Sequence, residues 1–389
     1  MAVDRTDAQQ RVGALLRTAK DSLNLSMAFL TRLDGTTQHL EVVESSIPFL
    51  MRDGITQKQE TSLCQAILDG ELPQVIPDLR AEPVAMTLPA ARMPRIRSYV
   101  SVPVILSDGT LYGTFCAAGL TPEKKLSDRD LGLMEVLANA ASLMIEPEIQ
   151  EQKRQRALVE RFAPLINAGG PTVVLQPIVE LASGRRVGAE ALSRFPAEWG
   201  LPPDVCFEQA HDAGVGDELE LLALSGANDH LAGVSGYVSM NVSPATLMTS
   251  QCRDLLASFE LDRVLLELSE HDQVADYDDL AVALKPLQEQ GMKLAIDDVG
   301  SGFSSLRHVV LTDPDVIKID RDVVTGVTNE PTRQTLVKAL VEFGHGCGAQ
   351  VVAEGIEKEQ DAALLTRLGV DLGQGWHLGR PGPPEELRD

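Results

Sequence analysis

The C-terminal half of the chain repeats one pattern, a short apolar and β-branched run that ends in a polar residue and is usually followed by a helical segment. Such a run is typical of a buried strand. Packing of the strand does not require the polar residue at its end, so that residue is a candidate for function. Eight runs follow the pattern: Thr172–Val179, Arg186–Ala191, Tyr237–Val242, Arg263–Leu268, Lys293–Ile296, Asp315–Ile319, Gln350–Ala353 and Val370–Gly375. Eight strands alternating with helices predict an α/β fold, specifically a (β/α)8 barrel.

The first connection departs from this alternation. Only Glu180–Arg185 separates the first two runs, and Ser183-Gly184 marks a turn within it. Because this segment is too short for a crossover helix, we expect the first strand to run antiparallel to the second. The longer connections leave room for helices, which are predicted at Pro203–Ala213, Glu218–Leu231, Tyr277–Gln290, Ser305–Val310, Thr332–Cys347 and Gln360–Leu368.

The polar residues at the ends of the runs should meet on one rim of the barrel, where active sites of this fold lie. Most of them are oxygen donors: Glu190, Asn241, Glu267, Asp297, Asp298 and Glu354. Oxygen ligands without His or Cys suit Mg²⁺ or Mn²⁺ rather than zinc. The set is too large for one magnesium ion and fits two ions that share Asp297.

Two of these carboxylates are adjacent. Asp297 and Asp298 end a short apolar run and precede Gly300-Ser301-Gly302. Adjacent anions repel each other and are costly to desolvate unless a cation lies beside them. Glycine allows the backbone to approach a ligand closely. A simple turn after a strand is the alternative interpretation.

Charge and cysteine content narrow the function classes. Lys and Arg number 34 against 57 Asp and Glu, a net charge of -23, so the chain is a poor candidate for binding nucleic-acid polymers. A small phosphorylated ligand stays possible, because bound metal ions invert the local field. Five scattered cysteines without CxxC spacing argue against a disulfide framework or a zinc site. With no signal segment and no run long enough for a membrane span, we expect a cytoplasmic protein that does not bind membranes.

The N-terminal half predicts a separate α+β domain. Its expected elements are a helix at Ala8–Leu25, strands at Ser26–Leu33, Thr37–Glu44, Leu72–Pro77, Ser98–Leu106 and Leu111–Ala118, a helix at Ser62–Leu68, an irregular loop at Leu79–Arg97 and a capping box at Ser127–Asp130. This order of elements, with Tyr112–Cys116 and Leu126–Leu131, resembles a GAF domain. Such domains bind varied small ligands or dimerise, so the ligand stays unknown. Cys64 is interpreted as a partly buried cysteine, the alternative being a redox or chromophore-linking thiol.

Apolar residues from Leu131 to Ile145 recur at helical spacing, Pro147 is expected to interrupt the helix, and Glu148–Phe162 resumes it. We therefore predict a sensor domain at 1–148, a helical linker at 149–162 and a barrel at 163–389. The helix over residues 127–162 is expected to form the seam of a homodimer; packing on its own domain alone is the alternative.

The C-terminal motifs together resemble the EAL-domain family of cyclic di-GMP phosphodiesterases, whose barrel also has an inverted first strand. The motifs are Gln176–Val179, Glu190–Arg194, Asn241–Pro244, Glu267–Glu270, Asp297–Ser305, Ile317–Asp320, Ala353–Glu357 and Gln374–Trp376. The resemblance implies hydrolysis of cyclic di-GMP to linear pGpG by a two-metal mechanism.

The resemblance also implies roles for single residues. Glu190, Asn241, Glu267 and Asp297 would hold one Mg²⁺ or Mn²⁺ ion, and Asp297, Asp298 and Glu354 the other. Lys318 would help to deprotonate the attacking water, Gln374 would orient it, and Glu270 would hold the Gly300–Ser305 loop. The remaining roles are substrate contacts for Gln176, Pro177, Leu192, Arg194 and Gln374, and support of the metal ligands for Glu357 and Asp320.

Departures from the family pattern leave all these ligands in place. They include Leu175 before Gln176-Pro177, and Val299 and Ser301 in the loop after the paired aspartates. A catalytically silent cyclic di-GMP receptor that signals through a dimer is the alternative hypothesis, and a metal-dependent hydrolase of another phosphodiester is a third. The sequence predicts neither the ligand of the sensor domain nor the choice between Mg²⁺ and Mn²⁺.

Overall fold

The computed structural model describes residues 5–47, 51–89, 96–269, 273–300 and 305–387. The chain forms two compact units, Met1–Arg154 and Gln155–Asp389. Among the described residues, none of the helices has the length and apolar character that crossing a membrane requires.

The N-terminal unit is built on a six-stranded antiparallel sheet in the order β3-β2-β1-β6-β5-β4. The strands are β1 (Met27–Leu33), β2 (Thr37–Ser45), β3 (Thr56–Lys58), β4 (Val75–Ile76), β5 (Ser98–Ile105) and β6 (Leu111–Gly119). The strands predicted at Ser26–Leu33, Thr37–Glu44, Ser98–Leu106 and Leu111–Ala118 are confirmed as β1, β2, β5 and β6. The predicted strand at Leu72–Pro77 is reduced to β4, and β3 was not predicted, because Thr56–Lys58 carries no apolar alternation.

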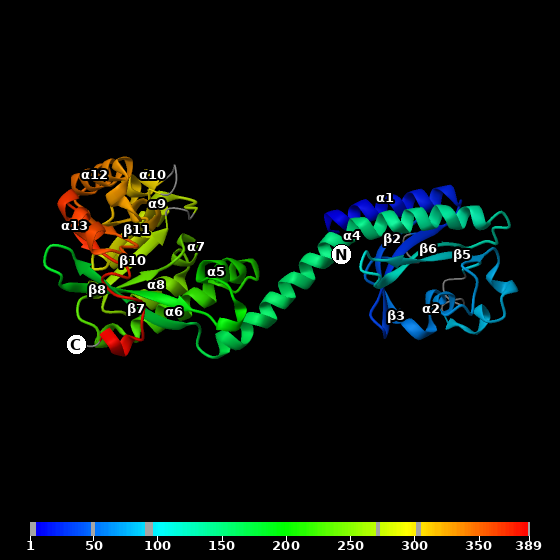
Figure 1. Ribbon diagram of the computed structural model, residues 1–389. Coiled ribbons are helices and arrows are strands. Elements are labelled where there is room, and N and C mark those ends of the chain that lie inside the picture. Colours follow the sequence, from blue (N-terminus) through cyan, green and yellow to red (C-terminus); the bar gives the residue numbers. More distant parts are fainter. Residues whose placement is uncertain (1–4, 48–50, 90–95, 270–272, 301–304, 388–389) are drawn as a thin grey trace. The chain divides into compact units, whose positions relative to one another are not determined.

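Helices cover both faces of this sheet. On one face, α1 (Asp7–Ser22) and the first part of α4 (Asp128–Asn167) lie side by side and pack against the strands (Figure 1). On the other face, the short helix α2 (Leu63–Leu68) and the segment that follows it close a second apolar cluster. A capping box between Thr6 and Gln9 starts α1.

Helix α4 corrects one prediction. It continues from Asp128 to Asn167 through Pro147, which was expected to interrupt it. Proline removes one hydrogen bond to the carbonyl four residues earlier, here that of Leu143. Leu143 is 71% exposed, so water can reach this face of the helix and hydrogen-bond to that carbonyl. The predicted boundaries at 148 and 162 fall inside this one helix and stay predictions.

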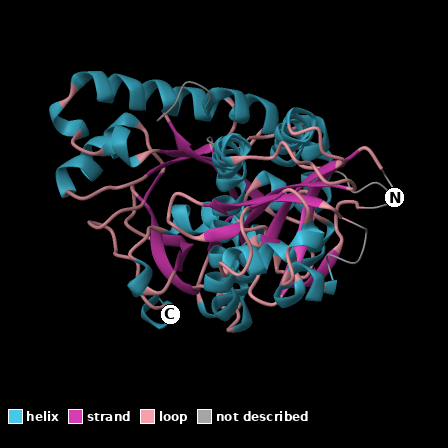
Figure 2. Ribbon diagram, turned by 90° about the vertical axis from the view of Figure 1, so that its right-hand side faces the viewer, coloured by secondary structure: helices cyan, strands magenta, loops and turns pink. Residues whose placement is uncertain are grey.

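The C-terminal unit is a closed eight-stranded barrel, and helices follow most of its strands along the chain. Figure 2 distinguishes the helices and strands of the chain by colour. Its strands are β7 (Thr172–Glu180), β8 (Arg186–Arg194), β9 (Tyr237–Asn241), β10 (Val264–Ser269), β11 (Lys293–Val299), β12 (Val316–Ile319), β13 (Gln350–Ala353) and β14 (Leu372–Gly373). Strand β7 pairs antiparallel with both β8 and β14, and the other neighbours pair in parallel. The predicted barrel and its inverted first strand are therefore confirmed.

The predicted helices are all present, with small shifts at their ends. They are α5 (Pro203–Asp212), α6 (Gly216–Asn228), α9 (Tyr277–Gln288), α10 (Ser305–Thr312), α12 (Pro331–Gly346) and α13 (Glu359–Leu368). Three short helices were not predicted: α7 (Pro244–Leu247), α8 (Ser250–Leu256) and α11 (Arg321–Val324). Four-residue helices such as α7 and α11 are too short to show a helical period.

Two layers of side chains fill the barrel interior. The first layer is an apolar cluster of Ile178, Leu265, Ala295, Val316, Val352 and Leu372. Since side chains on one face of a strand repeat every second residue, the second layer lies two residues further toward the rim. It contains Gln176, Glu267, Asp297, Lys318, Glu354 and Gln374. The barrel is thus closed by apolar packing at one end and carries a polar layer at the other.

Gly375, next to this polar layer, tests how tightly the rim is built. Its φ is +151°, and a Cβ placed there would lie 2.2 Å from the backbone nitrogen of Ile356. We expect Gly375→Ala to lower the free energy of unfolding of the barrel by about 3 kcal/mol, measured by urea denaturation. Gly346→Ala, where a Cβ meets nothing within 4 Å, is the control and should not destabilise. Equal stability of both variants would contradict the close approach.

Candidate metal centre

The side chain of Lys318 occupies the centre of the polar layer. Its Nζ lies 2.6 Å from Glu354 Oε1, 2.9 Å from Glu267 Oε2, 3.0 Å from Asp297 Oδ2 and 3.6 Å from Glu190 Oε1. Lys318 is 1% exposed. Burial alone would lower the pKa of Lys318, but the four carboxylates outweigh it and hold the pKa well above its usual value. In the absence of other cations, Lys318 is therefore charged.

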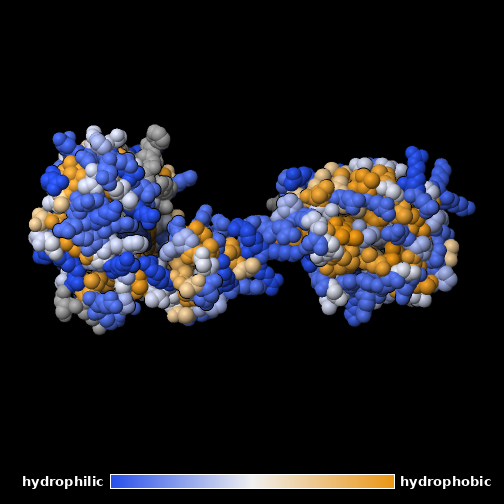
Figure 3. Space-filling view, in the orientation of Figure 1, coloured by the Kyte–Doolittle hydropathy of each residue, from blue (hydrophilic) through white to orange (hydrophobic). Residues whose placement is uncertain are grey.

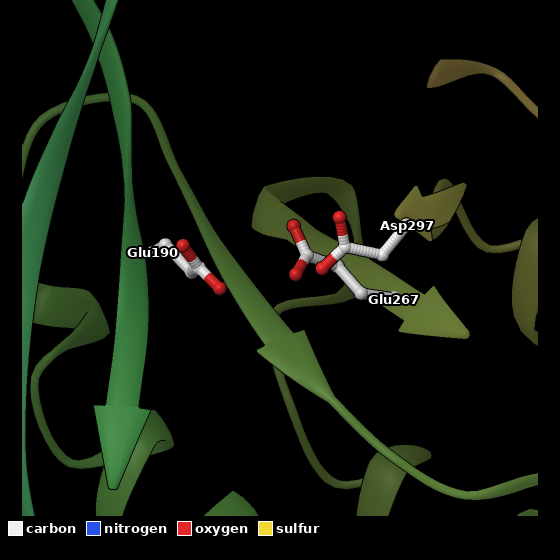
Figure 4. A group of neighbouring side chains, drawn as sticks. All are labelled: Glu190, Glu267 and Asp297. Carbon is white, nitrogen blue, oxygen red and sulfur yellow. The ribbon is translucent and has the colours of Figure 1, made fainter. Parts of the chain in front are cut away.

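The carboxylates form two overlapping groups. Oxygens of Glu190, Glu267 and Asp297 lie within 4.8 Å of one another, and so do oxygens of Asp297, Asp298 and Glu354. Figure 4 shows the first group, with Glu190 coming from β8 and facing Glu267 and Asp297 from β10 and β11. Asp297 belongs to both groups, as a ligand shared by two ions would.

The buried acids of this cluster differ in the direction of their pKa shifts. It raises the pKa of Glu267 to about 8, against the pull of Lys318, and together with Asp297 it raises that of Glu354 well above its usual range. Burial also acts on Glu190, but Lys318 and hydrogen bonds from Gln374 and Asn241 lower its pKa. One ammonium group thus does not neutralise the cluster. The donor set is all oxygen, and its acids outnumber the single ammonium group, so it fits divalent cations such as Mg²⁺ or Mn²⁺ that would replace the protons on the acids.

A bulge in β11 explains how two consecutive aspartates serve one site. In a regular strand, Asp297 and Asp298 would point to opposite faces. The register between β11 and β12 shifts between Ile296 and Val299, and Asp298 adopts a φ of +61°. Aspartate tolerates this left-handed conformation better than most residues. The bulge turns both carboxylates toward Glu354.

Amide side chains complete the layer. Gln374 Nε2 donates to Glu190 Oε2 at 2.5 Å and to Gln176 Oε1 at 3.1 Å, and Gln176 Nε2 donates to the Gly379 carbonyl at 3.0 Å. Asn241 Nδ2 donates to Glu190 Oε1 at 3.2 Å. Gln374 Oε1 is buried and has no hydrogen-bond partner among the described residues. A buried, unpaired acceptor beside an acidic cluster fits a bound water or ion.

A pocket of about 610 Å³ opens beside the carboxylates. Strand β8 contributes Leu192 and Arg194 to its wall, and Asn241, Asp297 and Asp298 line it near the metal ligands. Arg194 Nη1 donates to the Ser193 carbonyl at 2.9 Å. Arg194 thus lines the same pocket as Asp297 and Asp298.

Three further predicted site residues, Pro177, Asp320 and Glu357, do not line this pocket. A Cβ on Gly379 would lie 2.2 Å from Cγ of Pro177, so that proline packs against the backbone at Gly379. Asp320 caps α11 by accepting the Asp322 N–H at 2.6 Å, and Glu357 is exposed. Glu270 and most of the Gly300–Ser305 loop lie outside the described residues. The roles given to these residues, and to the metal ligands, stay predictions.

Sequence reasoning missed Glu220, which ties the pocket wall together. Glu220 is 6% exposed. Its Oε1 contacts His211 Nε2 of α5 at 2.5 Å, and its Oε2 accepts the N–H and Oγ–H of Ser243 at 2.9 and 3.0 Å. Ser243 follows β9 two residues after Asn241, so Glu220 joins α5, α6 and the strand end that presents Asn241. One sequence signal could have identified Glu220: it is a carboxylate within the apolar stripe of α6, beside Leu219 and Leu224.

Ser239 is the second group that the sequence did not single out. It lies on β9, is fully buried, and its hydroxyl donates to Glu267. This contact fixes the carboxylate that Lys318 holds from the other side.

Comparisons with known proteins agree with this geometry. A model of the EAL domain matches residues 155–381, more than half of the chain. The chain belongs to the EAL domain family. A model of the GAF domain matches residues 5–146. Among solved structures, the PaMucR phosphodiesterase in complex with c-di-GMP superposes with a TM-score of 0.53 at 28% identity, covering 59% of this chain and 99% of that one.

Curated relatives of the EAL barrel include the probable cyclic di-GMP phosphodiesterase PdeB of Escherichia coli, 30% identical over 225 residues, which are 54% of this chain and 43% of PdeB. The bifunctional diguanylate cyclase/cyclic di-GMP phosphodiesterase MucR of Pseudomonas aeruginosa is 31% identical over 227 residues. The chain spans 43% and 33% of the lengths of these two relatives. The uncharacterized protein Rv1357c of Mycobacterium tuberculosis is 27% identical over 303 residues, which are 71% of this chain and 97% of that protein.

Lys318→Met tests the electrostatic role of the central amine. Without divalent ions, the substitution leaves the buried carboxylates without their cation, and we expect a loss of about 3–5 kcal/mol in the free energy of unfolding of the barrel. Saturating Mg²⁺ should recover part of that loss, because ions that bind the folded state stabilise it. Urea denaturation with EDTA and with Mg²⁺ measures both values.

The matched control is Lys338→Met, which removes an exposed pair with Glu342 at 3.8 Å and should cost less than about 1 kcal/mol. If the free energy of unfolding of Lys318→Met is the same with EDTA and with Mg²⁺, the carboxylates of this variant do not bind the ion.

Proposed function

We propose that this protein is a Mg²⁺- or Mn²⁺-dependent phosphodiesterase that opens cyclic di-GMP to linear pGpG under the control of its N-terminal domain. The observation that supports this most directly is the double carboxylate cluster around Asp297, of which Asp297 and Asp298 line a pocket that Arg194 also lines. Membership of the EAL domain family supports the same reaction class. The names of PdeB and PaMucR supply the proposed substrate.

The proposed ligands follow the two carboxylate groups. Glu190, Asn241, Glu267 and Asp297 would hold one ion, and Asp297, Asp298 and Glu354 the other. Divalent ions held there would lower the pKa of the attacking water and stabilise the charge on the attacking and leaving oxygens. Glu190 is already ionised in the metal-free site, because the charge of Lys318 and two hydrogen bonds favour its anion.

Lys318 would act through its Nζ. With three of its carboxylate partners within 3.0 Å, its position is fixed. In the metal-free site, Nζ is protonated and can only donate hydrogen bonds. Cations bound to the same carboxylates would favour the neutral amine, because a nearby positive charge disfavours the ammonium form. Nζ could then accept a proton from water and act as a general base.

Arg194 and Gln374 would handle the substrate. The guanidinium of Arg194 offers a planar pair of donors that matches a phosphate. Gln374 Oε1 is a buried acceptor without a partner among the described residues, and it could hold one hydrogen of the attacking water. Gln176 would fix the orientation of Gln374 through the hydrogen bond between them.

Turnover of cyclic di-GMP tests the proposal. Purified protein with Mg²⁺ or Mn²⁺ should release pGpG, resolved by chromatography, and EDTA should abolish the product. Glu190→Ala should lower the rate by at least about 100-fold, the scale reported for removal of one group that stabilises the transition state.

The control is Glu180→Ala. Glu180 lies on β7 at the end of the barrel away from the pocket, where it pairs with Arg185. This variant should keep wild-type turnover. Binding of intact cyclic di-GMP without product in the wild type would favour the silent receptor instead. Faster cleavage of a different phosphodiester would overturn the choice of substrate.

A homodimer through α4 is the assembly we propose. Val136 and Leu143 are 64% and 71% exposed and lie seven residues apart, the spacing of a coiled-coil seam. Apolar residues also gather on the visible face of the N-terminal unit (Figure 3). The small-molecule ligand of the GAF domain, which would set the activity of the barrel, is unidentified.

Leu143→Glu should shift the protein from dimer to monomer, because a charge in an apolar helical seam is desolvated without a partner. Sedimentation velocity at micromolar concentration measures the change. Val282→Glu, on α9 at 72% exposure, is the matched control and should leave the dimer intact. A wild-type monomer would refute the assembly.

A further inference from the structure

The core of the N-terminal unit contains two thiols in contact. Cys64 on α2 and Cys116 on β6 lie with their sulfur atoms 3.5 Å apart, a non-bonded distance. They are 2% and 0% exposed. All five cysteines of the chain are free, and Cys347 is the exposed one. The pair is thus separated from bulk solvent and lies far along the sequence from every residue of the barrel site.

Polar groups surround these sulfur atoms, although apolar side chains would cost less free energy to bury at this position. The Tyr99 hydroxyl lies 3.0 Å from Cys64 Sγ, the Ser101 hydroxyl lies 3.3 Å from Cys116 Sγ, and Cys116 Sγ donates to Thr114 Oγ1 at 3.2 Å. Gln38 is fully buried, and its Nε2 has no hydrogen-bond acceptor among the described residues. Burying this many donors costs free energy unless an anion accepts from them.

The two thiols are driven toward different protonation states. The contact with Cys116 is the largest cause that lowers the pKa of Cys64, and with the Tyr99 hydroxyl and other nearby polar groups it outweighs burial and brings that pKa to about 6. Burial and the neighbouring Cys64 raise the pKa of Cys116 well above its usual value. A thiolate beside a protonated thiol is the arrangement of an attacking and a resolving cysteine.

We propose that Cys64 and Cys116 form a redox-active dithiol that reacts with small hydroperoxides. The Cys64 thiolate attacks one oxygen of the peroxide, the O–O bond breaks, and the products are a Cys64 sulfenic acid and hydroxide (or alkoxide), which takes up a proton. Cys116 then attacks the Cys64 sulfur, its thiol proton leaves with the sulfenic oxygen as water, and a disulfide forms. The two electrons lost by the sulfurs reduce the peroxide.

Closing the bond requires the sulfurs to move from 3.5 Å to about 2.05 Å. The change would draw α2 toward β6, across the face of the sheet opposite α1 and α4. Intracellular disulfides of this kind are usually transient and sense oxidants. Burial also defines the reagent, because a peroxide is small enough to reach the pair and a bulky aromatic disulfide is not.

The test uses the full-length protein in a Cys347→Ser background, which removes the exposed thiol. After reduction and desalting, hydrogen peroxide should produce a loss of two hydrogen masses. Non-reducing peptide mapping should then show a Cys64–Cys116 cross-link. Folded wild-type protein treated with 5,5′-dithiobis(2-nitrobenzoic acid) should show one reactive thiol, Cys347, while unfolded protein should show all five.

Two variants separate the roles of the cysteines. Cys116→Ser should trap a sulfenic acid on Cys64, detected as a dimedone adduct after quenching in denaturant, and Cys64→Ser should show neither adduct nor cross-link. Near-ultraviolet circular dichroism verifies that both variants fold. Absence of the cross-link in folded, peroxide-treated protein would overturn the proposal, as would an equal yield of dimedone adduct at Cys116 in Cys64→Ser.

Discussion

The ammonium group of Lys318 determines how the barrel interior is built. Four carboxylates from four strands converge on it, and without a cation their mutual repulsion would oppose closure of the barrel. One positive charge does not balance them. The ammonium group of Lys318 therefore supplies positive charge to the carboxylates that the proposed divalent ions would also bind. Lys318 thus connects the stability of the barrel with its proposed chemistry.

The period of the strands places this cluster. Each inward apolar residue of the lower layer lies two positions from a polar residue of the upper one, as in Leu265 and Glu267, and on the inverted β7 the polar Gln176 precedes Ile178. The two aspartates break that period and need a bulge. The left-handed backbone at Asp298 is the local cost of directing both carboxylates toward one site.

The sequence was sufficient for features set by local rules. The six-residue connection dictated the antiparallel β7, and the polar strand ends identified the rim. It was insufficient where tertiary context decides. Glu220 lies on α6, and its partners His211 and Ser243 come from α5 and the end of β9, so no short-range pattern joins them. Pro147 was predicted to break a helix that continues, because the affected carbonyl lies on a solvated face.

The two units share one design. Each buries a polar cluster, and in each the surroundings shift the pKa values of two like groups in opposite directions: Glu190 and Glu267 in the barrel, Cys64 and Cys116 in the N-terminal unit. Such pairs are uncommon in structural cores and typical of reactive sites. A lowered pKa would suit Glu190 to the proposed metal binding and Cys64 to the proposed attack on a peroxide. Oxidation would move α2 against one face of the sheet, and α4 covers the opposite face. The proposed thiol chemistry would thus act within the unit to which the proposed function assigns regulation.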